Sequence, residues 1–189
     1  MAQSKSAWRT RLRRKVLRLT SSEKKRFGAV IRSRLDRLIR VLHPRRLFAF
    51  ASLSSEPDLR PLYKKWMARR IQLAFPRVRG RSIQFHPISS TADLRPGAFN
   101  ILEPSAARKI IRPSRHDIVL IPCVGLNTLG YRLGHGGGFY DRYLRQNPES
   151  KCIALLFHCQ IDRKISHDRH DASVQFAVTE KGLFGFLIR

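Results

Sequence analysis

The stretch that decides the fold runs from Asp117 to Leu144 and reads DIVLIPCVGLNTLGYRLGHGGGFYDRYL. It opens with residues 118–124, an apolar run interrupted only by one proline, which is typical of a strand buried on both faces. A glycine-rich loop follows, and residues 140–146 are predicted to form a helix that ends before an Asn-Pro pair. A strand, a glycine-rich turn and a helix N-terminus gather free N–H groups around phosphate, so this stretch predicts a phosphate site.

Two common phosphate motifs do not fit the loop. The P-loop needs G-x-x-x-x-G-K-[ST], and Gly125 and Gly130 have that spacing but are followed by Tyr131 instead of lysine. The dinucleotide fingerprint G-x-G-x-x-G would require glycine where Phe139 stands. The glycines alone fit a tight turn equally well, but the arginine before them and the Tyr-Asp-Arg after them make the run more specific.

The run from Arg132 to Arg142, Arg-Leu-Gly-x-Gly-Gly-Gly-Phe-Tyr-Asp-Arg, follows a buried strand and has a glycine two residues before it. It closely resembles the signature of the 5-formyltetrahydrofolate cyclo-ligase family, also called methenyltetrahydrofolate synthetases. The similarity extends over nearly the whole chain. KSAWR at 5–9 resembles the family's Lys-x-x-x-Arg, and FNILEP at 99–104 resembles its Phe-x-Ile-x-Glu-Pro.

The resemblance implies an ATP-dependent C–N ligase that converts 5-formyltetrahydrofolate to 5,10-methenyltetrahydrofolate while MgATP becomes ADP and phosphate. The residues that it places at the nucleotide are Lys5, Arg9, Arg132, Leu133, Gly134, His135, Gly136, Gly137, Gly138, Phe139 and Tyr140. Those that it places at the folate are Arg9, Ala51, Glu56, Gly136, Gly137, Gly138 and Tyr140. The expected catalytic residues are Arg132, Tyr140 and Arg9, and the expected Mg²⁺ ligands are Asp141 and Asp171.

Several of these residues have a second interpretation. Lys5 and Arg9 would also suit a solvated basic helix, Glu56 a helix cap, Tyr140 the core and Asp171 a solvated loop. The family's spacing to a later threonine, Thr179, selects Asp171 over Asp168 as the metal ligand. His135 occupies the variable position of the glycine run and is expected to be a surface residue rather than a catalyst.

One departure from the family pattern lies before the glycine run. Where the family usually carries Phe-Asp, this chain has Leu126 and Asn127. Asparagine keeps the shape and the hydrogen-bonding ends of aspartate but has no charge. If the family's aspartate only braces the loop, this chain is expected to keep its activity. If that aspartate polarises the substrate, this chain is expected to be slow or to act on a different substrate.

Composition places the chain among basic globular proteins. Its 189 residues include 38 Lys and Arg against 13 Asp and Glu, a formal charge of +25, and the hydrophobic fraction is 42%. Such a charge attracts polyanions in general, including nucleotides, RNA and polyglutamylated folates. The three cysteines stand in apolar runs without metal-ligand spacing, which favours a reduced, cytoplasmic protein. The sequence predicts no membrane span, and its Arg- and Ser-rich first 22 residues are a weaker match to a transit peptide than to the family's own start.

The predicted fold is one α/β domain over residues 1–189, with three layers, a mostly parallel central sheet and a helical N-terminus that folds back onto the site. The resemblance implies a Rossmann-type architecture like that of the cyclo-ligases and the NagB/RpiA group. Helices are expected at 5–19, from 23 to before Pro44, and at 58–70. Strands are expected at 47–53, 71–78, 82–88, 118–124 and 152–159.

Two other functions remain open at this point. A basic member of the family could have become a nucleotide- or RNA-binding protein with weak or lost ligase activity, although the charges are not interleaved with aromatic residues as in a stacking platform. A sugar-phosphate isomerase or transferase of similar architecture could use the glycine loop for a substrate phosphate and would need no ATP. For the ligase, the expected partner is the folate, with or without a polyglutamate tail; a monomer is expected, with no specific nucleic acid and no membrane.

Overall fold

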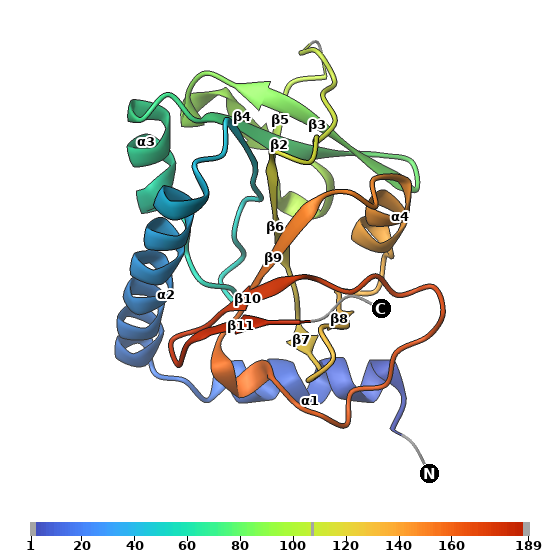
Figure 1. Cartoon of the computed structure of the whole chain (residues 1–189). Helices are drawn as coiled ribbons and strands as arrows, with labels where there is room; N and C mark the ends of the chain where they lie inside the picture. The colour runs from blue at the N-terminus through green and yellow to red at the C-terminus, as the bar shows by residue number, and fades with distance from the viewer. Residues whose placement is uncertain (1–2, 107, 187–189) are drawn as a thin grey trace.

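The computed structural model describes residues 3–106 and 108–186, and its centre is a seven-stranded sheet (Figure 1). The strand order is β11-β10-β9-β6-β1-β2-β3. The strands from β10 to β2 are parallel, and β3 and β11 are antiparallel edge strands. The strand bounds are β1 Arg46–Phe48, β2 Gln72–Arg79, β3 Ser82–Ile88, β6 Ile118–Pro122, β9 Lys151–Leu155, β10 Phe176–Val178 and β11 Leu183–Gly185. The prediction of a mostly parallel central sheet is confirmed.

Helices cover both faces of this sheet, which gives three layers (Figure 1). On one face, α2 and α3 place Leu35, Ile39 and Trp66 in a buried cluster with the sheet. On the other face, α4 contributes Tyr143 and Leu144 to a second cluster. The helix bounds are α1 Lys5–Leu17, α2 Ser21–Leu42, α3 Arg60–Ala68 and α4 Phe139–Gln146, and the 3₁₀ turns are η1 Thr91–Asp93, η2 Ala98–Asn100 and η3 His158–Gln160. The predicted α/β class is confirmed, and the predicted helices agree with these bounds to within about two residues.

The start of α2 is stabilised by hydrogen bonds between neighbouring residues. Thr20 Oγ1 accepts a hydrogen bond from the Glu23 N–H at 3.1 Å, and the Glu23 carboxylate accepts one from the Thr20 N–H at 2.8 Å. This reciprocal capping box satisfies two N–H groups that a helix start otherwise leaves unpaired. It also lowers the pKa of Glu23, chiefly through the bond from the Thr20 backbone.

Helix α1 lies across the carboxyl end of the sheet rather than on one of its faces (Figure 1). Trp8 and Leu12 pack there in a small separate cluster with Val124, Leu133 and Ile165. The apolar stripe of α1 is therefore buried against the loops that follow the central strands. The basic side of the helix is left at the end of the sheet where ligands bind in open α/β folds.

Three predicted strands are shorter than their apolar runs. β1 ends at Phe48 instead of residue 53, β6 at Pro122 instead of residue 124, and β9 at Leu155 instead of residue 159. Leu155 pairs with Pro122, the last residue of β6, so the chain beyond it has no strand partner on that side. The apolar run overestimates strand length because residues 49–50, 123–124 and 156–157 stay buried in loops that close the core.

Several short strands were not predicted. They are the edge pair β10 and β11, the hairpin of β4 Leu94–Pro96 with β5 Leu102–Pro104, and the hairpin of β7 Gly125–Leu126 with β8 Arg132–Leu133. Strands of two or three residues carry too little periodicity to be recognised. The β7–β8 hairpin matters for the site, because it places Arg132 on a strand. Within residues 3–106 and 108–186, no helix is both long and apolar enough to cross a membrane.

Asp117, directly before β6, makes the clearest contribution of a charged group to stability. Its side chain is 2% exposed, accepts from Arg46 Nη2 at 2.5 Å and accepts from the Ser114 N–H at 2.7 Å. Burial by itself raises the pKa of Asp117, but the Arg46 guanidinium and Ser114 outweigh it and hold that pKa below its usual value. A lowered folded-state pKa stabilises the protein above the unfolded value of about 3.9, and this contribution is lost as the pH falls through that range.

Replacing Asp117 with alanine is expected to lower the free energy of unfolding at pH 7 by about 3 kcal/mol, because a buried ion pair loses one partner. The difference from the wild type should shrink as the pH falls below about 4, where the wild type loses the same interaction. Urea denaturation at pH 7 and pH 3 measures both. The control is Asp58→Ala, whose partner Arg60 is 76% exposed. Equal losses in both variants would contradict the prediction.

Candidate active site

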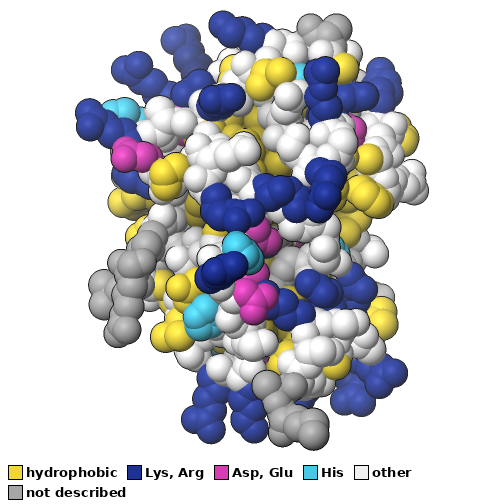
Figure 2. All heavy atoms as spheres, turned by 90° about the vertical axis from the view of Figure 1, so that its right-hand side faces the viewer, with side chains coloured by type: hydrophobic (Ala, Val, Ile, Leu, Met, Phe, Trp, Pro, Cys, Tyr) yellow, Lys and Arg dark blue, Asp and Glu magenta, His cyan; other side chains and the backbone are white. Residues whose placement is uncertain are grey.

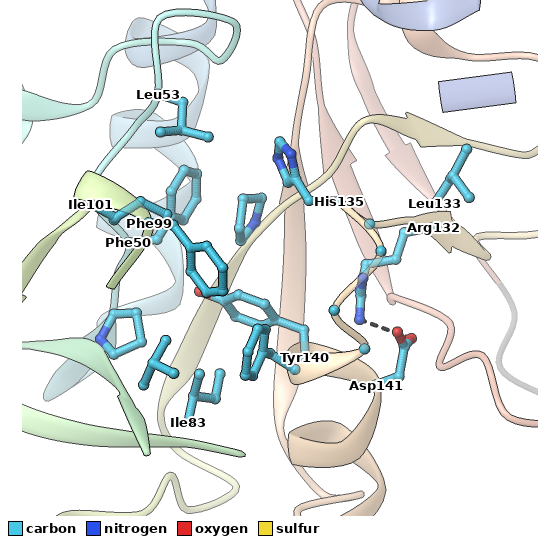
Figure 3. Close-up of a pocket in the computed structure, with 18 of the residues that line it drawn as sticks. Phe50, Leu53, Ile83, Phe99, Ile101, Arg132, Leu133, His135, Tyr140 and Asp141 are labelled. Atoms are coloured by element: carbon cyan, nitrogen blue, oxygen red, sulfur yellow. Dashed lines mark hydrogen bonds and ion pairs between the residues drawn. The ribbon is translucent and has the colours of Figure 1, made fainter. Parts of the chain in front are cut away.

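A cavity of about 540 Å³ opens at the carboxyl end of the sheet, between α1, the glycine loop and the β2–β3 hairpin (Figure 3). The structure brings every predicted site residue to its wall. They are Lys5, Arg9, Ala51, Glu56, Arg132, Leu133, Gly134, His135, Gly136, Gly137, Gly138, Phe139, Tyr140, Asp141 and Asp171. These residues come from segments as far apart as 166 positions in the chain, so their convergence is a property of the fold.

The glycine loop joins β8 to α4 and has the backbone conformation that only glycine tolerates well. Gly136 has a φ of 118° and Gly138, the residue before α4, has a φ of 64°. Arg9 of α1 donates from Nε to the Gly134 carbonyl oxygen at 2.8 Å, which fastens the loop to the N-terminal helix. The first turn of α4 presents N–H groups that have no partner inside the helix. Loop and helix together form a concave surface suited to phosphate oxygens.

Arg132 and Asp141 form an ion pair below this loop. Arg132 Nη2 donates to Asp141 Oδ1 at 2.9 Å, and the Arg132 side chain is only 2% exposed. The same carboxylate oxygen accepts from the Ala172 N–H at 3.3 Å. The Arg132 guanidinium also lies 5.7 Å from the centre of the Tyr140 ring, and its Nε has no partner among the described residues. A buried guanidinium with an unused N–H can donate a hydrogen bond to an anionic ligand.

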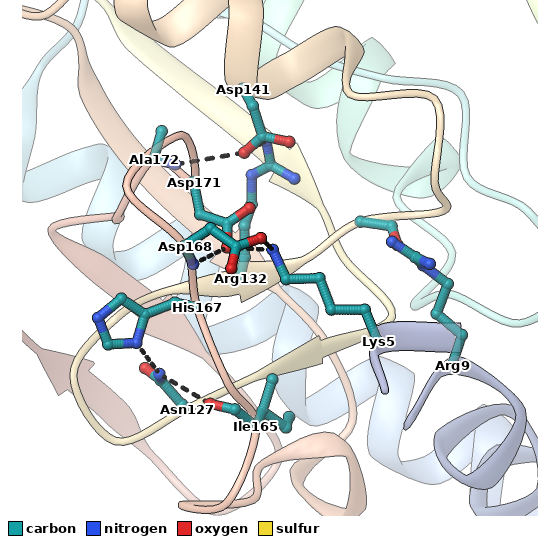
Figure 4. A network of polar contacts seen from close by, with 11 residues as sticks. Lys5, Arg9, Asn127, Arg132, Asp141, Ile165, His167, Asp168, Asp171 and Ala172 are labelled. Atoms are coloured by element: carbon teal, nitrogen blue, oxygen red, sulfur yellow. Dashed lines mark hydrogen bonds and ion pairs between the residues drawn. The ribbon is translucent and has the colours of Figure 1, made fainter. Parts of the chain in front are cut away.

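Lys5 forms the second charged group, and its partners come from the C-terminal part of the chain (Figure 4). Lys5 Nζ lies 2.5 Å from Asp171 Oδ2 and 2.6 Å from Asp168 Oδ2. Burial by itself lowers the pKa of Lys5, but the two carboxylates outweigh it and raise that pKa. Asp171 lines the cavity with a side chain 16% exposed, whereas Asp168 is 67% exposed and is not part of the wall. The choice of Asp171 over Asp168 therefore agrees with the geometry.

Glu56 and His135 meet at the mouth of the cavity. The Glu56 side chain is 4% exposed, and its Oε2 accepts from the Leu53 N–H at 2.9 Å. His135 Nε2 donates to Glu56 Oε1 at 3.0 Å, and Arg13 Nη2 lies 3.4 Å from His135 Nδ1. His135 is partly exposed, as expected for a surface residue, yet it ties the glycine loop to the loop after β1. Glu56 thus faces the cavity as an acceptor and is not the cap of α3.

One half of the cavity is apolar, and the predicted site residues include little of it. Phe99 packs edge-to-face on Phe139 with ring centres 6.1 Å apart, and both residues line the cavity. Phe99 is 75% exposed despite its size and has a left-handed φ of 57°. The further apolar wall residues are Phe50, Leu53, Pro76, Val78, Ile83 and Ile101. The FNILEP resemblance covers Phe99 without placing it at the site, and the β2–β3 side chains resemble ordinary core residues in the sequence.

Tyr140 stands where the apolar and charged halves meet. Its hydroxyl oxygen is buried and has no hydrogen-bond partner among the described residues, although the residue lines the cavity. Burial raises the pKa of Tyr140 above its ordinary value, so the phenol stays neutral and keeps a proton to donate. Leaving such a group unpaired is costly unless a ligand supplies the partner. The Tyr140 hydroxyl is therefore free to contact a polar ligand atom in the cavity.

The two expected metal ligands fit a magnesium ion that is shared with a phosphate. Among the described residues no group of three or more His, Cys, Asp or Glu side chains could enclose a metal ion. Mg²⁺ does not need such an enclosure, since it usually takes one or two carboxylates and completes its octahedron with water and phosphate oxygens. Asp141 and Asp171 both line the cavity beside the glycine loop, and each is held by one cation, Arg132 or Lys5.

The face of the molecule that lies on the right-hand side of Figure 1 carries many Lys and Arg side chains, with a few acidic and histidine side chains among them (Figure 2). Arg11 and Arg14 on α1, and Arg18 directly after it, do not line the cavity and are exposed. Such a field raises the local concentration of anions at the cavity mouth.

Comparison with known proteins identifies the family. The family model for 5-formyltetrahydrofolate cyclo-ligases matches residues 1–180. The 5-formyltetrahydrofolate cyclo-ligase of Escherichia coli strain K12 is 29% identical over 170 residues, which cover 85% of this chain and 92% of that protein. The 5-formyltetrahydrofolate cyclo-ligase of Mus musculus is 24% identical over 190 residues, which cover 94% of each chain.

Solved structures agree with this match. The NMR structure of Aquifex aeolicus 5,10-methenyltetrahydrofolate synthetase is similar with a TM-score of 0.82 at 29% identity, covering 96% of this chain and 92% of that one. A Mycoplasma pneumoniae 5,10-methenyltetrahydrofolate synthetase, at 22% identity and a TM-score of 0.77, shares the fold over 94% of this chain and 99% of that one. Since the family model spans almost the whole sequence, the chain belongs to the 5-formyltetrahydrofolate cyclo-ligase family.

Proposed function

We propose that this chain catalyses the ATP- and Mg²⁺-dependent cyclisation of 5-formyltetrahydrofolate to 5,10-methenyltetrahydrofolate, with release of ADP and phosphate. The observation that carries the proposal is the division of one cavity into an apolar half and a cationic, glycine-lined half that meet at Tyr140. The apolar half suits a flat pterin ring, and the glycine half suits a triphosphate. A phosphoryl group would pass between the two ligands where the halves join.

The chemistry has one difficult step, the removal of the formyl oxygen. The N5-formyl group is an amide, and its carbonyl carbon is a poor electrophile. Transfer of the γ-phosphoryl group of ATP to the formyl oxygen releases ADP and turns that oxygen into part of a phosphate leaving group. N10 then attacks the formyl carbon, the C–O bond breaks, phosphate leaves and N10 loses its proton. These steps need alignment of the reactants and positive charge around the phosphoryl oxygens, but no protein nucleophile.

The charged half supplies those requirements. The N–H groups of residues 134–138 and of the first turn of α4 would bind the phosphates. Arg132, with an unused Nε–H and almost no exposure, would stabilise the charge that builds up on the transferred phosphoryl group. Lys5 adds a second cation at the same mouth, and Arg9 holds the loop through Gly134 while its guanidinium faces the cavity.

The apolar half would hold the folate. Phe99 and Phe139 offer aromatic surfaces for the pterin, and Ala51 leaves room beside them. Glu56 would accept hydrogen bonds from the N–H edge of the pterin, at the oxygen now bonded to His135. The unpaired Tyr140 hydroxyl would donate to the formyl group or to the phosphoryl oxygen next to it. It would thereby orient the reacting atoms.

Asp141 and Asp171 would hold Mg²⁺ together with phosphate oxygens. When bound, the ion would supply positive charge beside the phosphate groups and would stabilise the charge that develops on ADP. Arg132 and Lys5 hold the two carboxylates beside the loop. We further propose a cytoplasmic monomer whose surplus positive charge, +25 for the chain, accommodates a polyglutamate tail on the folate.

The test is the growth of the methenyltetrahydrofolate absorption band when purified protein meets 5-formyltetrahydrofolate. We expect growth only with MgATP, at the turnover of an ordinary enzyme, about 1–100 s⁻¹. Growth without ATP, or none at all from protein shown to be folded, would refute the proposal. In that second outcome, RNA binding that weakens steeply with salt would support the nucleic-acid-binding alternative.

A further inference from the structure

Asn127, in the turn between β7 and β8, contacts two separate parts of the site without lining the cavity. We propose that Asn127 is a positioning residue that holds the segment 165–171, and with it Asp171 and Lys5, in the arrangement that MgATP needs. The proposal rests on the proposed function for its kinetic readout. Its structural part concerns the position of that segment and can be tested on its own.

The acceptor end of the Asn127 side chain organises the hairpin. Asn127 is 3% exposed, and its Oδ1 accepts from the Leu129 N–H at 3.0 Å and from the Tyr131 N–H at 2.9 Å. The backbone N–H of Asn127 in turn donates to the Tyr131 carbonyl at 3.0 Å. These bonds close the turn directly before Arg132, so they set where β8 begins. A carboxylate at position 127 could accept the same two bonds.

The donor end reaches a different part of the chain. Asn127 Nδ2 donates to the Ile165 carbonyl oxygen at 3.2 Å and lies 3.5 Å from His167 Nδ1 (Figure 4). The Tyr131 ring stacks on the His167 ring with centres 3.8 Å apart and planes inclined by 8°. The Asn127–Ile165 hydrogen bond and the Tyr131–His167 ring stack therefore join the hairpin to the segment, and directly after the segment the Val174 N–H donates to the Gly130 carbonyl oxygen at 2.9 Å.

The segment leads directly to the charged half of the cavity. Ile165 is buried against Trp8 and Leu12 of α1, and Asp168 and Asp171 hold Lys5 of the same helix. The Asp168 N–H also donates to Asp171 Oδ2 at 2.7 Å, so the orientation of the Asp171 carboxylate depends on the backbone of the segment. Removing the anchor at Ile165 would loosen both the proposed metal ligand and its lysine.

This arrangement uses an amide, and an acid could not replace it fully. Aspartate at position 127 would point a carboxylate oxygen at the Ile165 carbonyl oxygen, replacing an attraction with a repulsion. The asparagine is thus a working part of this chain rather than a catalytic acid that has been lost. Asn127→Asp acts on this link, because it keeps the hairpin bonds and replaces the donor to Ile165 with a charged acceptor.

The experiment compares Asn127→Asp with Asn147→Asp in the full-length protein. Asn147 is the matched control, because its Nδ2 likewise donates to a carbonyl, that of Tyr143 at 2.8 Å, at the far end of α4. Asn127→Asp is expected to raise KM for MgATP about tenfold and to leave KM for 5-formyltetrahydrofolate within about twofold. Amide hydrogen exchange in residues 165–173 should become faster in Asn127→Asp alone.

The other outcomes either contradict the positioning role of Asn127 or contradict the proposed function instead. Unchanged hydrogen exchange and an unchanged KM for MgATP in Asn127→Asp would show that position 127 has no positioning role. Exchange that rises evenly through the whole protein would indicate a loss of global stability, which also contradicts the proposal. A wild type without turnover refutes the proposed function, and in that case faster exchange confined to residues 165–173 still supports the link.

Discussion

Asp141→Asn is expected to lower MgATP-dependent turnover about 100-fold or more, the loss typical of removing one preorganised electrostatic group from an active site. Asparagine keeps an oxygen for the bonds from Arg132 Nη2 and the Ala172 N–H. It removes the negative charge that would hold Mg²⁺ and balance the buried guanidinium. Because both hydrogen bonds remain, the protein should still fold while the chemistry fails, although the thermal transition should fall as Arg132 loses its counter-ion. Turnover is measured from the methenyltetrahydrofolate band, and folding from the thermal transition.

The matched control is Asp168→Asn, because the Asp168 carboxylate pairs with Lys5 but does not line the cavity. Its turnover should stay within about threefold of the wild type, because a pair with so exposed a partner contributes little. A titration with Mg²⁺ adds a second readout, since Asp141→Asn should need more of the ion for its remaining activity. The assignment of Asp141 fails if the two variants lose equal activity or if Asp141→Asn keeps most of it.

Arg132→Lys is the second large effect, with an expected loss of about 100-fold in kcat/KM for MgATP, even though the charge is retained. Arginines that stabilise a transferred phosphoryl group contribute about 10³–10⁵-fold in other enzymes, and lysine lacks the planar fork. In this site one arm of the fork binds Asp141 while Nε remains free, and the guanidinium lies against the Tyr140 ring. A lysine ammonium would serve one of these contacts at most.

Arg145→Lys, at an exposed position of α4, is the control for Arg132→Lys. Arg145 contacts only His170 among the described residues, at 3.3 Å, so its replacement should leave kcat and both KM values nearly unchanged. Steady-state kinetics with each substrate varied in turn separates binding from chemistry. If Arg132→Lys raised KM for 5-formyltetrahydrofolate and left the MgATP parameters alone, Arg132 would belong to the folate half instead.

Every residue that the sequence predicted for the site lines the cavity, but many residues that line the cavity were not predicted. All of the predicted residues line the cavity, from Lys5 to Asp171, because they were identified through a long and specific motif and its companions. Their individual roles remain predictions. Most of the apolar half was missed, since Val78 and Ile83 alternate like any half-buried strand residues and nothing in the sequence marks which face meets a ligand.

Position 127, where this chain departs from the family pattern, likewise shows what the sequence can and cannot reveal. The sequence showed that a carboxylate was absent, and it left open whether the position braces the loop or acts on the substrate. The four contacts of the Asn127 side chain favour a role in bracing the loop. One of them, the hydrogen bond that Nδ2 donates to the Ile165 carbonyl oxygen 38 residues away, is predicted by no sequence pattern.

The sequence by itself determined the family, the α/β class, the helices and the glycine-rich loop. These features depend on neighbouring residues, such as the glycines that permit positive φ, the capping box at Thr20 and the apolar runs of central strands. Tertiary structure alone decided which charges are paired, as in Lys5 with Asp171 and His135 with Glu56, and where the apolar half of the cavity lies. Hydrogen bonds and ion pairs act over a few ångströms, so they depend on how the sheet brings together segments that the sequence keeps far apart.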